Sequence, residues 1–166
     1  MMKTLMLMRH AHAASNNPAW SDHERPLTDH GRQLATATGK LLAECPPDCI
    51  VYSTATRTTE TAQLIAAQCP SPPAMSAQQN LYLASSAAYL DAAVELGAAG
   101  HQAVMVVGHN PGIASLVNRW SRESLAFMPA TVAILELNVN DWQELRSGGR
   151  FHPELTGYIS EGLRHR

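Results

Sequence analysis

The sequence predicts an α/β fold: a three-layer α/β/α sandwich around a mainly parallel sheet with an antiparallel edge. Short apolar runs typical of buried strands alternate with segments in which apolar residues recur at helical spacing. Strands separated by helices pair in parallel, and the helices cover both faces of the sheet. The last strand-forming segment, residues 131–146, predicts a hairpin instead, which adds antiparallel strands at the edge.

Length and composition indicate one globular domain over residues 1–166. A chain of 166 residues lies close to the most common domain size of roughly 100 to 150 residues. The hydrophobic fraction of 45% and the charged fraction of 16% are typical of a globular soluble protein. The formal net charge of -2 indicates no basic surface for nucleic acid, so we expect no nucleic-acid partner.

The cysteines and the apolar segments predict a cytoplasmic protein. Cys45, Cys49 and Cys69 are odd in number and irregularly spaced, which argues against the disulfide framework of a secreted protein. No apolar stretch approaches the roughly 20 residues that span a bilayer. Residues 1–8 are followed by Arg9 and His10, not by the small-residue cleavage site of a signal peptide. We therefore expect reduced thiols and no membrane association.

The first half of the chain predicts two strand–helix units. Residues 5–8 are expected to form the first strand, and the polar, turn-rich residues 11–26 a loop over the site, since loops this long are usually functional. Thr28 is suited to the N-cap of the first helix. Residues 50–52 predict the second strand, and the apolar spacing in residues 56–67 predicts the second helix.

The middle of the chain is less regular. Residues 70–76 contain several prolines and are expected to form a linker within the domain, while residues 80–83 predict either a short strand or the end of a loop. A third helix is expected to be capped by Ser85 or Ser86. Glycines end that helix before a strand at residues 103–107.

The last third predicts one more helix and the hairpin. Asn110 and Pro111 are suited to the cap and first position of a helix over residues 111–120. Residues 131–139 contain several strand-forming residues, and residues 141–146 are expected to pair with them as the hairpin.

Histidine and arginine side chains follow three of the predicted strands. His10 ends the first strand, His109 ends the strand at residues 103–107, and Arg57 follows the second strand. The carboxyl ends of parallel strands share one edge of a sheet, where ligands bind. Two histidines and two arginines, Arg9 and Arg57, are therefore expected in one crevice that suits a phosphoryl group. The glycine-rich phosphate loops of nucleotide-binding proteins are missing.

These residue types suit phosphoryl transfer. An unprotonated imidazole, here His10, can attack phosphorus when the charge of the phosphate is neutralised. The guanidinium groups of Arg9 and Arg57 can each grip two phosphate oxygens, and their charge disfavours protonation of His10. His109 could stabilise the equatorial oxygens as negative charge shifts during transfer.

The motifs taken together resemble the histidine phosphatase superfamily, whose fold is phosphoglycerate mutase-like, and within it the small bacterial phosphohistidine phosphatases of the SixA type. The matching residues are Met8-Arg9-His10-Ala11, Arg25-Pro26-Leu27-Thr28 with Gly31, Ser53 with Arg57, Thr61 and Ala62, and Val107-Gly108-His109-Asn110-Pro111. One departure is Ala11, which stands where glycine is common. The resemblance covers roughly two-thirds to three-quarters of the chain.

The resemblance implies that His10 is transiently phosphorylated, that Arg9, Arg57 and His109 form the phosphate pocket, and that water then releases inorganic phosphate. It implies no metal and no cofactor. Larger relatives place a glutamate acid after the third strand, but the corresponding residues 81–85 contain no carboxylate. A phosphoramidate needs such an acid less than a phosphate monoester does, because imidazole is a better leaving group than an alkoxide. The missing glutamate therefore favours phosphohistidine.

Several roles remain open from the sequence alone. Asp22 or Glu24 could still supply a proton. Arg25 could contact phosphate, or anchor the loop by pairing with Asp22 or Asp29. Ser53 could donate a hydrogen bond in the pocket, or simply end its strand.

Two further residues have alternative interpretations. Asn110 could contact the substrate, orient His109, or only cap its helix. His12, two residues after His10, could suggest a metal site, but no further zinc-type spacing supports one.

The leading hypothesis is a phosphatase for phosphohistidine on a partner protein, such as a phosphorelay or sugar-transport carrier. One alternative is a small-molecule phosphomonoesterase of the same fold. The other is a phosphate- or phosphohistidine-binding module without turnover.

Overall fold

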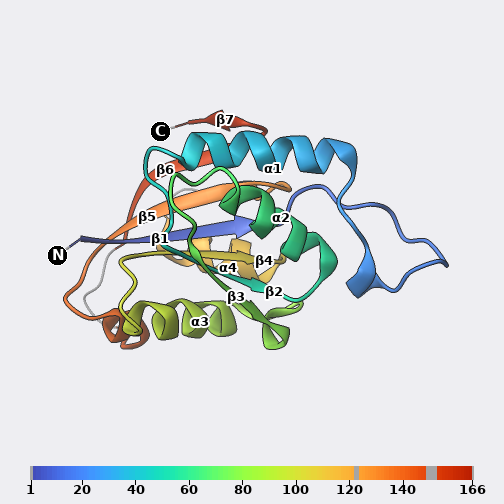
Figure 1. Cartoon of the computed structure of the whole chain (residues 1–166). Coiled ribbons are helices and arrows are strands. Elements are labelled where there is room, and N and C mark those ends of the chain that lie inside the picture. Colours follow the sequence, from blue (N-terminus) through green and yellow to red (C-terminus); the bar gives the residue numbers. More distant parts are fainter. Residues whose placement is uncertain (1, 122–123, 149–152, 166) are drawn as a thin grey trace.

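The computed structural model describes residues 2–121, 124–148 and 153–165, and these residues form a mixed sheet with helices on both faces (Figure 1). The sheet has seven strands in the order β3-β2-β4-β1-β5-β6-β7. The strands are β1 (Met2–Arg9), β2 (Cys49–Ser53), β3 (Ala74–Gln78), β4 (Ala103–Gly108), β5 (Val132–Asn138), β6 (Glu154–Ser160) and β7 (Leu163–Arg164). The helices are α1 (Asp29–Leu42), α2 (Thr56–Ala66), α3 (Ser86–Ala98) and α4 (Gly112–Trp120).

The sheet is parallel on one side of β1 and antiparallel on the other. β1 pairs in parallel with β4 and antiparallel with β5, and the remaining parallel strands follow outward from β4. The antiparallel strands β5, β6 and β7 form the other edge. This arrangement confirms the predicted α/β/α fold class.

Alternate residues of β1 belong to the two layers of the core. Leu5 and Leu7 pack in the cluster that contains α3 and α4, whereas Met6 and Met8 pack in the cluster that contains α1 and α2. All four are fully buried. In Figure 1, α1 and α3 accordingly lie on opposite sides of the sheet. A continuous apolar run is what a strand covered on both faces requires.

The predicted helix caps at Thr28 and Ser85 are confirmed. The Thr28 hydroxyl accepts a hydrogen bond from the Gly31 backbone N–H, and the Ser85 hydroxyl accepts one from Ala88. Gly31 also lets α1 approach the chain after β1, since a Cβ added there would lie 2.1 Å from the carbonyl oxygen of His12. The first turn of α1 is thereby held against the loop that begins at the end of β1.

The predicted linker at residues 70–76 is wrong, because residues 74–78 form strand β3. Of the two alternatives for residues 80–83, the short strand is absent, since Gln79–Leu81 form a short 3-10 helix. β3 lies at the edge of the sheet and pairs only with β2. An edge strand is largely exposed, so its residues need not show the apolar pattern of a buried strand.

The predicted hairpin partner of β5 is also wrong. Residues 142–146 form a 3-10 helix, and β6 is the strand that pairs with β5. The Asp141 side chain caps this helix, and the Glu144 side chain accepts a hydrogen bond from the Asp141 backbone N–H. Trp142, which is buried, anchors the helix by donating its indole N–H to the carbonyl of His101. Local capping and one buried aromatic side chain therefore outweigh the turn-forming sequence.

Candidate phosphate site

The two histidines lie side by side at the carboxyl ends of neighbouring strands. Arg9 at the end of β1 is paired in register with Gly108 at the end of β4, so His10 and His109 emerge together. Their ring centroids are 5.4 Å apart. The juxtaposition expected from strand ends is therefore present in the structure.

His10 presents an unprotonated nitrogen. Its Nδ1–H donates to the carbonyl oxygen of Ala11 at 2.7 Å, because a carbonyl can only accept. The lone pair of the neutral ring is therefore on Nε2. The side chain is 9% exposed, and burial, followed by the charges of Arg57, Arg9 and Arg25, lowers its pKa to about 4 against the opposing Ala11 hydrogen bond. Arginine charge disfavours protonation as expected, but desolvation is the larger cause.

The loop after His10 is fixed by a hydrogen bond to α2. The backbone N–H of Ala11 donates to the Thr61 hydroxyl at 3.1 Å, and that hydroxyl donates to the carbonyl of Arg57. The loop carrying His10 and the helix carrying Arg57 are thus joined directly.

Arg57, near the start of α2, is 2% exposed and partly bound by the first loop. Its Nη1 donates to the Asp22 carbonyl at 2.7 Å and its Nη2 to the Asp22 carboxylate at 3.1 Å. Its Nε is buried and has no hydrogen-bond partner within the described residues. Asp22 belongs to the segment over residues 11–26, so that loop does reach the site as expected.

Arg9 and His109 each have a buried ring or guanidinium nitrogen that lacks a hydrogen-bond partner among the described residues, as Arg57 does. Nη1 of Arg9 donates to the Phe127 carbonyl at 3.0 Å, while Nε is buried. His109 is 2% exposed, and its Nδ1 is buried too. In the described part of the chain, neither Nε of Arg9 nor Nδ1 of His109 has a partner.

Buried polar groups without partners cost free energy, about 1–3 kcal/mol each and more when the group is charged. Two of these three nitrogens belong to guanidinium groups, whose N–H groups can only donate and whose charge is positive. The arrangement therefore favours an anion with several acceptor oxygens, next to the nucleophilic nitrogen of His10. A tetrahedral phosphoryl group has that chemistry.

Asp22 is ionised and holds several groups at once. Its carboxylate accepts hydrogen bonds from Tyr82, Arg25 and Arg57. The Tyr82 hydrogen bond, followed by Arg57 and Arg25, lowers its pKa to about 2, although burial opposes the shift. A carboxylate ionised at neutral pH has no proton to give, which weighs against Asp22 as a proton donor. The other candidate, Glu24, accepts a hydrogen bond from the Ser21 hydroxyl on the exposed side of the loop.

Tyr82 is the site residue that the sequence did not indicate. Its ring meets the His109 ring edge-on at 5.5 Å between centroids, and the Arg57 guanidinium carbon lies 5.8 Å from its centroid. It belongs to the segment where larger relatives are expected to carry a glutamate. The only sequence signal was an aromatic residue in a short apolar run, which equally suggests a core position.

Arg25, Ser53 and Asn110 each hydrogen-bond to neighbouring protein groups. Arg25 pairs with Asp22 at 3.0 Å and donates to the Ala14 carbonyl, the anchoring role weighed for it. Ser53 is fully buried and contacts Nε2 of His109 at 2.6 Å, so its hydrogen bond goes to that ring.

The expected capping role of Asn110 is wrong. α4 begins at Gly112 after a cis Asn110–Pro111 bond, and the Asn110 amide donates to the Phe127 carbonyl. Nη1 of Arg9 donates to the same carbonyl, so both side chains are tied to one point of the loop before β5.

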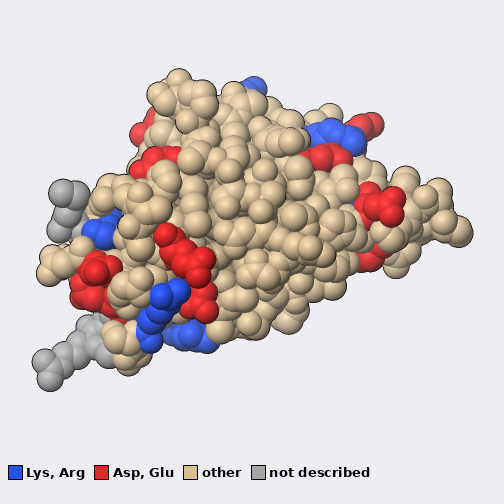
Figure 2. Space-filling model, turned by 60° about the horizontal axis from the view of Figure 1, so that its bottom comes forward, with Lys and Arg blue, Asp and Glu red and all other residues tan. Residues whose placement is uncertain are grey.

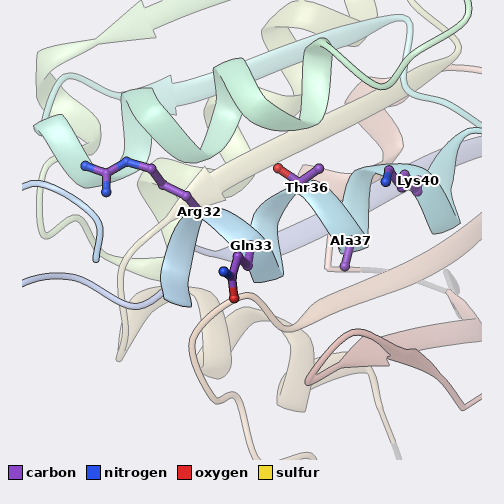
Figure 3. Close-up of a pocket in the computed structure, with 5 residues that line it drawn as sticks. All are labelled: Arg32, Gln33, Thr36, Ala37 and Lys40. Carbon is purple, nitrogen blue, oxygen red and sulfur yellow. The ribbon is translucent and has the colours of Figure 1, made fainter. Parts of the chain in front are cut away.

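A depression of about 250 Å³ is lined by His12, His30, Leu34, Met128, Pro129 and Glu161. A depression of about 400 Å³ lies along α1 and is lined by Arg32, Gln33, Thr36, Ala37 and Lys40 (Figure 3). Arg32 is engaged there by Asp29 and Glu60. On the face shown in Figure 2, acidic and basic side chains form small separate groups. No cluster of three or more metal-ligating side chains occurs in the part of the chain that is described. None of its helices is both long and apolar enough to cross a bilayer.

Comparison with known proteins finds similarity to histidine phosphatases, both in sequence and in structure. The family model of the histidine phosphatase superfamily (branch 1) matches residues 5–79, which include Arg9, His10 and Arg57. A structure from Agrobacterium tumefaciens, assigned as a phosphohistidine phosphatase SixA, is 25% identical, with a TM-score of 0.78 over 95% of this chain and 97% of that one. A structure from Nakamurella multipartitia with the same assignment is 29% identical, with a TM-score of 0.77 over 96% of each chain.

A curated relative also matches. It is an uncharacterised chloroplast protein of Arabidopsis thaliana, 28% identical over 157 residues, which are 86% of this chain and 70% of that protein. Together with the site geometry and the two SixA-assigned structures, these matches show that the chain has the histidine phosphatase fold of the SixA type, and they support its assignment to the histidine phosphatase superfamily.

Proposed function

We propose that this protein hydrolyses phosphohistidine on a partner protein through a covalent phosphohistidine on His10. The observation that carries the proposal is the unprotonated Nε2 of His10 together with two buried guanidinium nitrogens, Nε of Arg9 and Nε of Arg57, that have no partner among the described residues. A nucleophile and an anion-binding set in one place are what phosphoryl transfer requires.

In the first step, Nε2 of His10 attacks phosphorus and forms a P–N bond. The P–N bond to the partner's imidazole breaks, and the leaving imidazole takes the electron pair and picks up a proton. Arg9 and Arg57 stabilise the negative charge on the equatorial oxygens. In the second step, water attacks the phosphorus on His10 and the P–N bond breaks. Inorganic phosphate is released and His10 is free again.

The surroundings of the site support an imidazole leaving group. Residues 81–85 contain no carboxylate, and Asp22 is ionised by its contacts with Tyr82 and the arginines. A phosphate monoester would need a proton donor for its alkoxide, whereas imidazole leaves more readily. The SixA assignment of the two structural relatives agrees with this substrate class.

The test compares phosphohistidine presented on a protein with an alkyl phosphate of similar size. We expect kcat/KM to be far higher for phosphohistidine, and His10→Ala to reduce it by at least about 10³-fold. A phosphoenzyme trapped during turnover should be acid-labile, alkali-stable and mapped by peptide to His10. Similar kcat/KM values for both substrates would favour a small-molecule phosphatase. Labelling without phosphate release would favour a binding module.

A further inference from the structure

A pair of buried hydroxyl groups lies behind His109, on the side away from its unpartnered Nδ1. The Ser53 hydroxyl is 2.6 Å from Nε2 of His109 and 2.8 Å from the hydroxyl of Thr58. The Thr58 hydroxyl is also 2.7 Å from the Ser53 carbonyl and 2.9 Å from the Ala55 carbonyl. Ser53 and Thr58 are both fully buried, so water does not compete for these contacts.

The number of hydrogens in this cluster determines which nitrogen of His109 is protonated. The two carbonyls can only accept, so the single hydroxyl hydrogen of Thr58 points to them. The short contact between the two hydroxyls then requires the hydrogen of Ser53. No hydroxyl hydrogen is left for the contact with His109, so Nε2 must carry the hydrogen and donate it to Ser53. With the Thr58 hydrogen directed to the two carbonyls, this assignment leaves neither the contact between the hydroxyls nor the contact with His109 without a hydrogen.

The neutral His109 ring therefore has a bare lone pair on Nδ1. Within the described residues, no group donates a hydrogen bond to that atom. The charged and titratable groups that face the ring are His10, Arg57, Asp22 and His23, and Tyr82 meets it edge-on. A bare lone pair repels an anionic oxygen that carries no hydrogen, whereas an N–H would bind it.

We propose that Ser53 and Thr58 hold His109 as its Nε2–H tautomer, so that Nδ1 binds the phosphoryl group only together with one additional proton. The inference rests on the proposed function only in placing the phosphoryl group between His10 and His109. That proton is shared between Nδ1 and a phosphoryl oxygen, and it comes from solvent when the ligand arrives as a dianion. Ser53 and Thr58 are positioning residues, since neither reaches the ligand itself.

The first measurement is the tautomer of the ligand-free protein. Nitrogen-15 NMR of the His109 ring at neutral pH should show a protonated Nε2 and an unprotonated Nδ1. Thr58→Val removes the acceptor for the Ser53 hydrogen, which then turns to Nε2 and moves the ring hydrogen to Nδ1. The matched variant Thr58→Ser keeps the hydroxyl and should keep the wild-type tautomer. An Nδ1–H in the wild type, or an unchanged tautomer in a folded Thr58→Val variant, overturns the inference.

The second measurement is proton uptake on anion binding. Sulfate carries no proton at neutral pH, so calorimetry in buffers of different ionisation enthalpy reports protons taken up by the protein. We expect an uptake of about one proton per bound sulfate. It should persist in His10→Ala, disappear in His109→Gln, and fall in Thr58→Val. Sulfate binding without proton uptake, or uptake lost in His10→Ala, contradicts the inference. Neither measurement uses phosphohistidine, so failure of the proposed substrate is detected separately.

Discussion

Arg57 is the residue whose side chain connects the first loop to the phosphate site. Two of its nitrogens are held by Asp22 while Nε is left for a ligand. The guanidinium is thus oriented before any ligand binds, which reduces the side-chain conformational entropy that is lost on binding. Lysine could supply the charge at this position but not the fork of donors.

We predict that Arg57→Ala lowers kcat/KM for phosphohistidine by about 10²-fold, because charge-assisted hydrogen bonds contribute about 1.5–3 kcal/mol each. Arg57→Lys should recover only part of this loss. Steady-state kinetics of both variants measures the effect. Arg32→Ala, on the exposed face of α1, is the control and should match the wild type. A wild-type rate for Arg57→Ala would exclude Arg57 from the phosphate site.

The lowered pKa of His10 predicts a pH dependence of stability. The pKa falls from 6.5 to about 4 on folding, so the unfolded chain binds more protons in that interval. Stability should therefore be fully retained above about pH 6.5 and decline as the pH falls toward 4, with His10 accounting for about 3 kcal/mol. Urea unfolding between pH 7 and pH 4.5 tests this, and His10→Gln should show a smaller decline. An equal decline in both proteins would assign the effect to other groups.

At the scale of the element, α1 packs closely against the chain that follows β1, since a Cβ at Gly31 would lie 2.1 Å from the His12 carbonyl oxygen. Gly31 lies against the His12 carbonyl, and Thr28 caps the helix and contacts the His12 ring. Since His12 follows His10 by two residues, α1 and the nucleophile share one rigid support.

Gly31→Ala is expected to destabilise the protein by about 2–4 kcal/mol and to lower activity, because its methyl group must displace backbone. Gln33→Ala in the same helix is the control. Gln33 is exposed and alanine favours helix, so the cost should be small. Thermal unfolding and kcat measure both variants. Equal stabilities would show that the His12 contact does not constrain α1.

Elements differ in how far the sequence determines them. The strands β1, β2, β4 and β5 have strong apolar runs because they are buried in the interior of the sheet, and all four are predicted. β3 has no such pattern because it pairs on one side only. The choice of β6 as the partner of β5 depends on segments distant from one another, which local patterns do not encode.

For the whole molecule, we propose that residues 1–166 fold as one domain. The two core clusters lie on opposite faces of the same sheet and share β1, so neither can form without that strand. We predict a single cooperative unfolding transition, with the same midpoint for tryptophan fluorescence and far-ultraviolet circular dichroism. Two separated transitions would indicate independently folding parts.

The sequence by itself determined the fold class and the meeting of His10 with His109, because strand periodicity and parallel pairing are properties of local pattern and simple topology. It also indicated Arg9 and Arg57, since cationic residues at strand ends are visible in the chain. Only the tertiary structure placed Tyr82 and Asp22 on Arg57, and Ser53 and Thr58 behind His109. Those contacts join residues from separate loops and helices, and their chemistry depends on burial and hydrogen-bond geometry that exist only once the layers have packed.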